Sequence, residues 1–278
     1  MGFFDKLIKP KTIKSRSYGE VIVFVSEEKL PDDLNELNKM GRYYINPYNG
    51  QKPEYDKAVI INRKLVQLDT EKKYMEARRR LGDLYANGQG TAKDLEKGNA
   101  LRNEWYSYEI LHCESIYSLG MQLTGCLERH CMSLRQMMEL ACQRLKMDWE
   151  NYAAPVGAAV LDFLLPLWKN RDVQAARGLT NQQYCQYLYD TSQDPNMLYA
   201  LSGFEKDYSQ SKSMTYRAAD AGSVFAVTAI TNLYLAYTKE PAELKQLMEY
   251  RRQEDQLKIA LQEKAGEYIR QDPEEIMQ

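Results

Sequence analysis

The residues best suited to chemistry lie in one short stretch, which contains both histidines of the chain and three of its five cysteines. They are His112, Cys113, Cys126, His130 and Cys131. Cys126 and His130 have the i, i+4 spacing of one helical turn, so together they could chelate a metal ion such as zinc. A cysteine beside a histidine could also form a nucleophile pair.

Several features weigh against both kinds of chemistry. The chain has no Cys-x2-Cys knuckle, and no residue can be identified that would orient the histidine or stabilise an oxyanion. The sequence also lacks a His-Glu-x2-His zinc helix, a phosphate loop ending in Gly-Lys-Ser/Thr, and a Gly-x-Ser-x-Gly elbow. The competing interpretation is that the cysteines are small buried hydrophobic residues and that the histidines lie at the edges of packed helices.

Charged and aromatic clusters are candidates for binding. Arg78, Arg79 and Arg80 are consecutive, so on a helix they point in three directions and do not form one patch. We expect Arg79 to pair with Asp83 across one turn on a solvated face, and the alternative is contact with an acidic partner. The aromatic groups at 105–108 and 184–189 belong either to the core or to a binding surface.

Composition sets broad limits on the function. The 278 residues carry a formal net charge of -2, which gives no general attraction to nucleic acid. No stretch reaches the roughly 18 uncharged apolar residues that a membrane span needs, so we expect no stable membrane insertion. The first residues lack the apolar core and cleavage site of a signal peptide. We therefore expect a cytoplasmic protein with free thiols.

The pattern of apolar residues predicts mostly helices. The first ~20 residues are basic and indicate a short amphipathic helix or an arm, followed by one strand-like run at Glu20–Val25. From about residue 32, Leu, Ala, Tyr and Met recur at helical spacing. A long polar loop is expected after Tyr189. The last helix is expected at Pro241–Ile269, with an apolar stripe that loses phase at Arg251–Asp255.

One segment has a distinctive spacing that predicts a helix, a glycine turn and a second, antiparallel helix. Its fixed positions are Ala77, Leu81, Gly82, Tyr85, Gly88, Gly90 and Asp94. The first residues line one helix face, Gly82 permits close approach of a neighbouring helix, Gly88 and Gly90 allow positive φ angles, and Asp94 can cap the next helix.

This segment resembles the Sel1-like repeat, a relative of the tetratricopeptide repeat. Gly98 departs from the alanine that the family prefers, and Trp105 comes later than the family's tryptophan. Weaker echoes occur at Met40-Gly41-x2-Tyr44 and Leu119-Gly120-x2-Leu123. The Ala-Ala-x2-Gly ending of a second helix occurs twice, at Ala153-Ala154-x2-Gly157 and at Ala218-Ala219-x2-Gly222. The alternative is an irregular helical domain in which these elements are ordinary tight packing.

The resemblance implies an all-α, right-handed superhelical solenoid of degenerate Sel1-like helix pairs with a short N-terminal extension. It places the extension at 1–30, the repeats at 31–240 with an insertion near 181–208, and a C-terminal capping helix at 241–278. Solenoids need such caps for solubility.

The resemblance also implies a bacterial scaffold or adaptor, not an enzyme, that binds a partner protein on its concave face without a metal or cofactor. A narrower form is a cognate immunity protein that neutralises a toxin. The expected contact residues are Arg79, Asp83, Trp105 and Tyr106. The alternative function is a metal-dependent or thiol enzyme that uses the cluster between His112 and Cys131.

Overall fold

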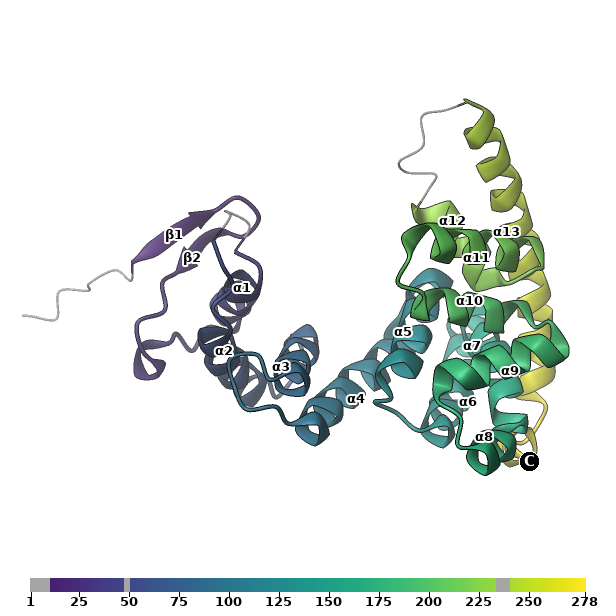
Figure 1. Ribbon diagram of the computed structural model, residues 1–278, viewed down its shortest axis with the longest axis horizontal. Helices are drawn as coiled ribbons and strands as arrows, with labels where there is room; N and C mark the ends of the chain where they lie inside the picture. The colour runs from purple at the N-terminus through teal and green to yellow at the C-terminus, as the bar shows by residue number, and fades with distance from the viewer. Residues whose placement is uncertain (1–10, 48–50, 234–240) are drawn as a thin grey trace, which may run out of the picture. The chain divides into compact units, whose positions relative to one another are not determined.

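The chain is mostly helical, in agreement with its apolar spacing. The computed structural model describes residues 11–47, 51–233 and 241–278. Over these ranges it has fourteen α-helices and one two-stranded sheet, and most helices pack against their neighbours (Figure 1). This arrangement is compatible with a helical repeat protein. Contacts divide the chain into two compact units, Met1–Trp105 and Tyr106–Gln278, which we call the N-terminal and C-terminal units.

The N-terminal unit begins with a β-hairpin. Strand β1 (Thr12–Ser15) pairs antiparallel with β2 (Gly19–Ile22), and Gly19 adopts a φ of 69° in the turn between them. Strand β2 lies on helix α1 (Leu34–Ile45), where Val21 is fully buried. After β2, the backbone N–H of Phe24 donates a hydrogen bond to the Tyr44 hydroxyl at 2.9 Å.

This hairpin differs from the sequence expectation. The predicted strand at Glu20–Val25 is present as the shorter β2, but Thr12–Ser15 is a strand and not part of a basic helix or arm. Strand β1 has only four residues, which is too few for a clear alternation of apolar and polar side chains, so the strand is recognised only from its pairing with β2. The rest of the predicted basic segment, at 1–10, lies outside the described residues.

Helices α1, α2 (Tyr55–Leu68), α3 (Glu76–Asn87) and the first part of α4 (Leu95–His112) complete the N-terminal unit. Helix α2 packs on both α1 and α3, as neighbouring members of a helix-pair repeat do. The core between them is built from residues at three- and four-residue spacing, which gives each helix one apolar face. Its members include Leu37, Met40, Ile61, Leu65, Ala77 and Leu84.

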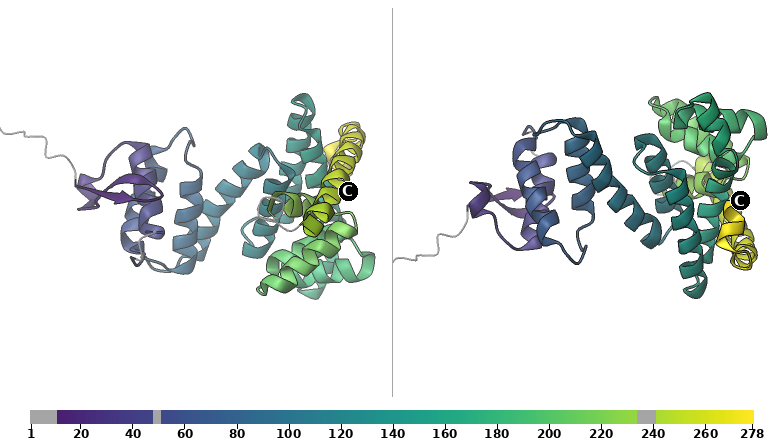
Figure 2. Two further views of the ribbon diagram at one scale, coloured as in Figure 1. Left: turned by 90° about the horizontal axis from the view of Figure 1, so that it is seen from above. Right: turned by 90° about the horizontal axis from the view of Figure 1, so that it is seen from below.

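The C-terminal unit contains the remaining helices. Helices α6 and α7 pack on each other, as do α10 and α11, and α11 and α12. The long helix α13 runs along one side of this unit against α6, α7 and α12 (Figures 1 and 2). The bounds are α5 Ile116–Arg129, α6 Leu134–Glu150, α7 Ala154–Lys169, α8 Arg171–Arg177, α9 Asn181–Ser192, α10 Pro195–Phe204, α11 Tyr208–Asp220, α12 Val224–Leu233, α13 Pro241–Ile269 and α14 Pro273–Met277.

Phe225 on α12 is at the centre of the C-terminal core. Its ring contacts Phe163 of α7 edge-on, with centroids 5.5 Å apart, and stacks on Tyr199 of α10 at 6.0 Å. Gly120 of α5 approaches the same ring so closely that a Cβ there would lie 2.8 Å from Phe225 Cδ1. Helix α5 packs on α7, α9, α10 and α12.

The helix predicted at Pro241–Ile269 is confirmed as α13. The long polar loop expected after Tyr189 is wrong, because α9 continues to Ser192 and α10 begins at Pro195. Asp194 caps α10 by accepting a hydrogen bond from the Asn196 N–H, so the polar residues there form a tight turn. None of the helices over the described ranges has both the length and the apolar character that a bilayer crossing needs.

Candidate functional site

The three consecutive arginines of α3 have three different environments, as their spacing predicts. Arg78 is buried and forms ion pairs with Asp69 and Glu104, both at 3.1 Å. Arg79 is half-buried, and Arg80 is buried against Asn62 of α2 and Asn38 of α1. Successive residues of an α-helix are rotated by about 100°, so the three side chains leave the helix in different directions.

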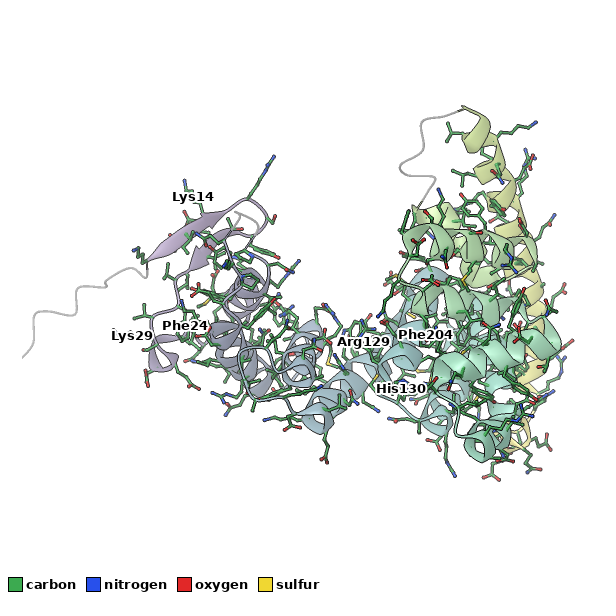
Figure 3. All side chains as sticks on the ribbon, in the orientation of Figure 1. Lys14, Phe24, Lys29, Arg129, His130 and Phe204 are labelled. Carbon is green, nitrogen blue, oxygen red and sulfur yellow. The ribbon has the colours of Figure 1, made fainter. Side chains whose placement is uncertain are left out.

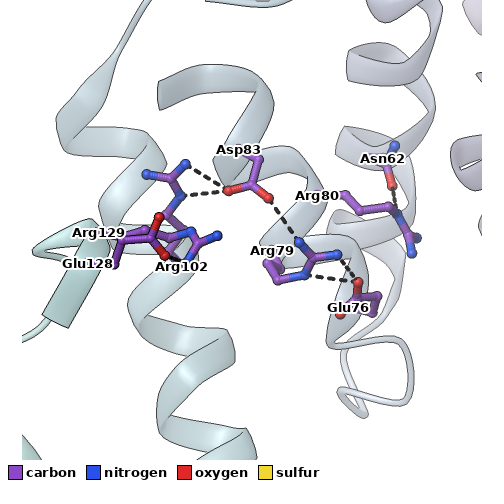
Figure 4. A network of polar contacts seen from close by, with 8 residues as sticks. All are labelled: Asn62, Glu76, Arg79, Arg80, Asp83, Arg102, Glu128 and Arg129. Carbon is purple, nitrogen blue, oxygen red and sulfur yellow. Dashed lines mark hydrogen bonds and ion pairs between the residues drawn. The ribbon is translucent and has the colours of Figure 1, made fainter. Parts of the chain in front are cut away.

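Arg79 is held in place by two acidic neighbours, which Figure 4 shows, and by one aromatic ring. Its Nε donates to Glu76 at 2.9 Å and its Nη1 to Asp83 at 3.1 Å, which confirms the expected Asp83 pair. Asp83 also pairs with Arg102 of α4 at 2.7 Å. The Arg79 guanidinium lies over the Trp105 ring, 5.3 Å from its centroid. These contacts restrict the rotamers of a side chain that is otherwise flexible.

Arg79 and Asp83 lie in the wall of a surface cavity of about 320 Å³, which we call the arginine pocket. Helices α1 and α3 supply most of the wall, and Tyr18 of the β-hairpin, Asn46 after α1 and Gln89 after α3 complete it. The lining residues are Tyr18, Arg42, Ile45, Asn46, Glu76, Arg79, Arg80, Asp83, Leu84 and Gln89. Three guanidinium groups and two carboxylates therefore face one cavity.

Arg80 has no carboxylate within ion-pair distance among the residues that the structure describes. Its Nε donates to Asn62 Oδ1 at 3.0 Å and its Nη2 to Asn38 Oδ1 at 2.7 Å, and both acceptors are neutral amides. The Arg80 pKa is lowered to about 10, mainly by burial and in smaller part by charge repulsion from Arg42 and Arg79, while Glu76 opposes the shift. Arg80 is therefore a cation at neutral pH, in a region with little solvent to stabilise it.

The amide that holds Arg80 is itself fixed. Asn62 is fully buried on α2 and donates from Nδ2 to the Ala58 carbonyl at 2.8 Å. It packs against Gly41 of α1, where a Cβ would lie 2.7 Å from Asn62 Oδ1. Gly41 therefore allows α1 to approach Asn62 of α2 closely, and Asn62 in turn holds the buried Arg80 in the pocket.

The four predicted contact residues are not equally placed for binding. Arg79 and Asp83 line the arginine pocket. Trp105 is 8% exposed and Tyr106 is 3% exposed, and the Tyr106 hydroxyl lies against Gly125 of α5. Arg42 and Arg80 were missed as site residues. The run of three arginines drew attention to Arg80. No motif in the surrounding sequence indicates Arg42, which reaches the pocket because α1 packs on the rest of the unit.

The residues of the predicted repeat segment shape the turn from α3 to α4. Gly88 and Gly90 have φ angles of 65° and 70°, as the turn requires. A Cβ on Gly90 would lie 2.2 Å from the Tyr55 backbone carbon, so the turn presses against the start of α2. Asp94 accepts from the Lys97 N–H at 2.9 Å, and a Cβ on Gly82 would lie 2.8 Å from the Gly98 carbonyl oxygen of α4. Ala77, Leu81 and Tyr85 are buried on α3.

The second motif segment lies in the C-terminal unit. Ala218 and Ala219 are fully buried near the end of α11, and Gly222 follows with a φ of 98°. The Ser223 N–H donates to the Ala218 carbonyl and the Gly222 N–H to the Ala219 carbonyl, both at 2.9 Å. These two bonds close the end of the helix in the way a glycine C-cap does.

The His–Cys cluster separates into exposed histidines and buried cysteines. His112 is exposed and stacks on Tyr108, with ring centroids 4.2 Å apart, and His130 is exposed at the end of α5 (Figure 3). Burial raises the pKa of the Cys113 thiol to about 11, and burial together with the neighbouring Cys131 raises that of Cys126. A raised thiol pKa disfavours the thiolate that a nucleophile needs.

A metal centre is likewise not formed by these residues. Over the described ranges, no three His, Cys, Asp or Glu side chains are grouped so that they could hold a metal ion. The one-turn spacing of Cys126 and His130 does not give a shared site, because Cys126 faces the core while His130, at a φ of 49°, ends the helix in solvent.

A second cavity, of about 400 Å³, lies in the C-terminal unit beside Glu254 of α13. Glu254 is 1% exposed and accepts hydrogen bonds from Thr228 at 3.2 Å and Thr231 at 2.9 Å. It also pairs with Arg251 at 3.2 Å and Lys258 at 2.6 Å. The apolar stripe of α13 loses phase here because a buried carboxylate replaces an apolar residue.

No protein-family model matches the chain, and a comparison with curated proteins finds no match.

Proposed function

We propose that the chain is a scaffold or adaptor that binds a partner protein, with the arginine pocket as part of the contact surface. The observation that carries this proposal is the fixed position of Arg79 in the pocket wall, between Glu76, Asp83 and Trp105. Arginine is enriched among residues that dominate binding energy at protein interfaces. A side chain that is already ordered loses less conformational entropy when a partner binds.

The fold that we propose is a right-handed solenoid of degenerate Sel1-like helix pairs. Its support is the repeated use of glycine on the first helix of a pair, at Gly41 in α1 and Gly82 in α3. Each lies against the following helix of its own pair. Repeat proteins of this type present extended surfaces to a partner segment. We infer binding, not catalysis, because the buried thiols are unsuited to nucleophilic attack.

A narrower form of the proposal is a cognate immunity protein that neutralises a toxin in the cytoplasm. It predicts that the partner is encoded by a neighbouring gene. Coexpression of the chain with each neighbouring product, followed by copurification, tests this form separately from the general one.

Capture of partners with matched variants tests the general proposal. Full-length protein and the variants Arg79→Ala and Arg63→Ala would be used to recover proteins from native lysate, with mass spectrometry as the readout. Arg63 is the control, because it is a surface arginine of the same unit that pairs with Glu27 away from the pocket. We expect a set of proteins that bind the unmodified chain and the Arg63 variant but are lost with the Arg79 variant.

Purified partner and chain should then form a complex whose Kd rises at least about tenfold with Arg79→Ala, since a charge-assisted hydrogen bond contributes roughly 1.5–3 kcal/mol. Recovery of the same proteins by all three forms would reject the arginine pocket as a contact surface. Circular dichroism of each variant checks that the helices are intact.

A further inference from the structure

We propose that the arginine pocket receives a carboxylate side chain from an acidic segment of the partner protein, which binds to Arg80 and Arg42. This inference rests on the proposed function and names the chemistry of the partner. The pocket wall carries more cationic than anionic side chains.

The two carboxylates of the pocket are already used by other arginines. Glu76 pairs with Arg79, and Asp83 pairs with both Arg79 and Arg102. Over the part of the chain that the structure describes, neither Arg42 nor Arg80 forms an ion pair. Arg42 lies over the Tyr18 ring, 5.0 Å from its centroid, which leaves its hydrogen-bond donors available. Among the described residues, the pocket thus has two cations that are not in an ion pair with a carboxylate.

Arg80 is the stronger of the two attractions, because it is 7% exposed and fixed. Asn62 and Asn38 accept from Nε and Nη2, and within the described residues Nη1 has no hydrogen-bond acceptor. A guanidinium group offers its donors in a planar fork that matches the two oxygens of a carboxylate. The buried Asn62 therefore holds a preorganised donor at the cavity.

The alternatives for the occupant fit less well. A cationic group would meet three guanidinium groups at short range. An apolar group would exclude water from Arg80 without giving it a counter-charge, and an unpaired buried charge is strongly unfavourable. A volume of about 320 Å³ exceeds what a lone inorganic anion needs and suits a side chain with part of its backbone.

Binding of short peptides tests this inference. The probes are hexaglutamate and hexaglutamine, with acetate, citrate and inorganic phosphate as small anions. Titrations would use the full chain and the variants Arg42→Gln, Arg80→Gln and Arg63→Gln, with calorimetry for affinity and the ¹⁵Nε signals of arginine as the local readout. Arg42 is exposed, so its variant keeps the fold if the buried Arg80 variant does not.

We expect hexaglutamate to bind and to shift the Arg80 Nε signal, while hexaglutamine does not. The affinity should fall about tenfold or more with Arg42→Gln and with Arg80→Gln, and should be unchanged with Arg63→Gln. Binding of citrate or phosphate without hexaglutamate would make the pocket a site for small anions and overturn the inference. Binding that is equally weakened by Arg63→Gln, or no binding of any anion, would also overturn it.

These outcomes are separate from those of partner capture. If a partner depends on Arg79 but no anion binds at Arg80, the proposed function stands and this inference fails. If hexaglutamate binds at Arg80 but capture with the Arg79 variant recovers every protein, the pocket binds acidic peptide while its place in the proposed interface is wrong.

Discussion

Asp69, at the end of α2, is fully buried and receives hydrogen bonds from the backbone N–H groups of Lys73 and Tyr74. Its counter-charge is Arg78, whose Nη1 lies 3.1 Å from Oδ2. Arg78→Met would keep the volume but leave the carboxylate without its cation, so we expect the free energy of unfolding to fall by about 3–5 kcal/mol.

Urea unfolding followed by circular dichroism measures this loss. The control is Arg63→Met, because the Arg63 and Glu27 side chains are 50% and 54% exposed and such pairs contribute about 1 kcal/mol or less. Equal losses in the two variants would contradict the structural role of Arg78.

The cysteines allow a chemical test at the same scale. All five are buried and free, and burial raises the pKa of Cys113 to about 11 and that of Cys185 to about 12. At about pH 8 we therefore expect slow reaction of the folded chain with a disulfide reagent, and fast reaction of all five thiols in urea. A single fast thiol in the folded chain would contradict this expectation and would favour the thiol-enzyme alternative.

At the scale of elements, the contact between α3 and α4 depends on two glycines that face each other. A Cβ on Gly82 would lie 2.8 Å from the Gly98 carbonyl oxygen, and the same atom on Gly98 would lie 2.8 Å from Ala86 Cβ. We expect Gly82→Ala to lower the free energy of unfolding by roughly 1–3 kcal/mol, because the backbone must move apart.

The matched control is Gly266→Ala in α13, where the nearest atom to the added Cβ is 3.4 Å away on Trp149. That contact is ordinary, so the higher helix propensity of alanine should raise the free energy of unfolding by up to about 1 kcal/mol. Thermal and urea unfolding of both variants measure the difference. A neutral or stabilising Gly82→Ala would show that the two helices are not packed as described.

The contact between α12 and α13 predicts a pH dependence. Burial opposes ionisation of Glu254, but hydrogen bonds from Lys258 and Thr231 and the charges of Lys258 and Arg251 lower its pKa below the ordinary 4.5. The folded chain then binds fewer protons than the unfolded chain just below this value. Stability from Glu254 is present above about pH 4.5 and is lost as the pH falls through the folded pKa.

Glu254→Gln removes this contribution, and we expect a loss of about 2 kcal/mol near pH 7. The difference between the variant and the unmodified chain should shrink as the pH falls below about 4. Urea unfolding over a range of pH measures it, with Glu263→Gln on the exposed face of α13 as control. A difference that stays constant with pH would contradict the lowered pKa.

Local patterns predicted much of the fold at this scale. Helical spacing identified α3 and α13, and the glycine and aspartate positions identified the turn between α3 and α4. A short sequence motif was less informative where tertiary packing determines its position in a helix. Ala-Ala-x2-Gly ends α11 at Gly222, but at Gly157 it begins α7, where the glycine lies against the Leu145 backbone. The same motif occurs at a helix end and at a close contact between helices because both need a small residue.

Sequence patterns of this kind could predict only two of the charged site residues, Arg79 and Asp83, but not Arg42 and Arg80. Arg79 and Asp83 lie one turn apart on a single helix, so their pairing could be read directly. Arg42 and Arg80 lie on different helices, with the whole of α2 between them in the sequence, and they share a cavity because α1 and α3 both pack on α2. Contacts between distant segments of this kind have no periodic signal.

At the scale of the whole molecule, each unit has its own core. Leu37 and Ile61 are fully buried in the N-terminal core, and Phe163 and Phe225 are fully buried in the C-terminal core. The division of the chain into an extension, a repeat region and a capping helix stays a prediction. We expect separate cores to respond separately when one of them is damaged.

Leu37→Ala tests this independence. The loss of a fully buried leucine should destabilise the N-terminal unit by about 2–5 kcal/mol. Hydrogen exchange read by mass spectrometry should show faster exchange in α1, α2 and α3, with α6, α7 and α12 unchanged. Faster exchange throughout the chain would mean that the two units unfold as one.

Gly41, Gly82 and Gly98 share one property that bears on how the gene can vary. At each of them the space of a methyl group is occupied by the neighbouring helix. Glycine is the smallest residue, so any amino-acid replacement at these positions adds at least one atom where there is no room. Among descendants of this gene that keep the N-terminal unit, these three positions should accept amino-acid replacements most slowly. Variants that do replace one of these glycines should carry a second, compensating replacement on the facing helix.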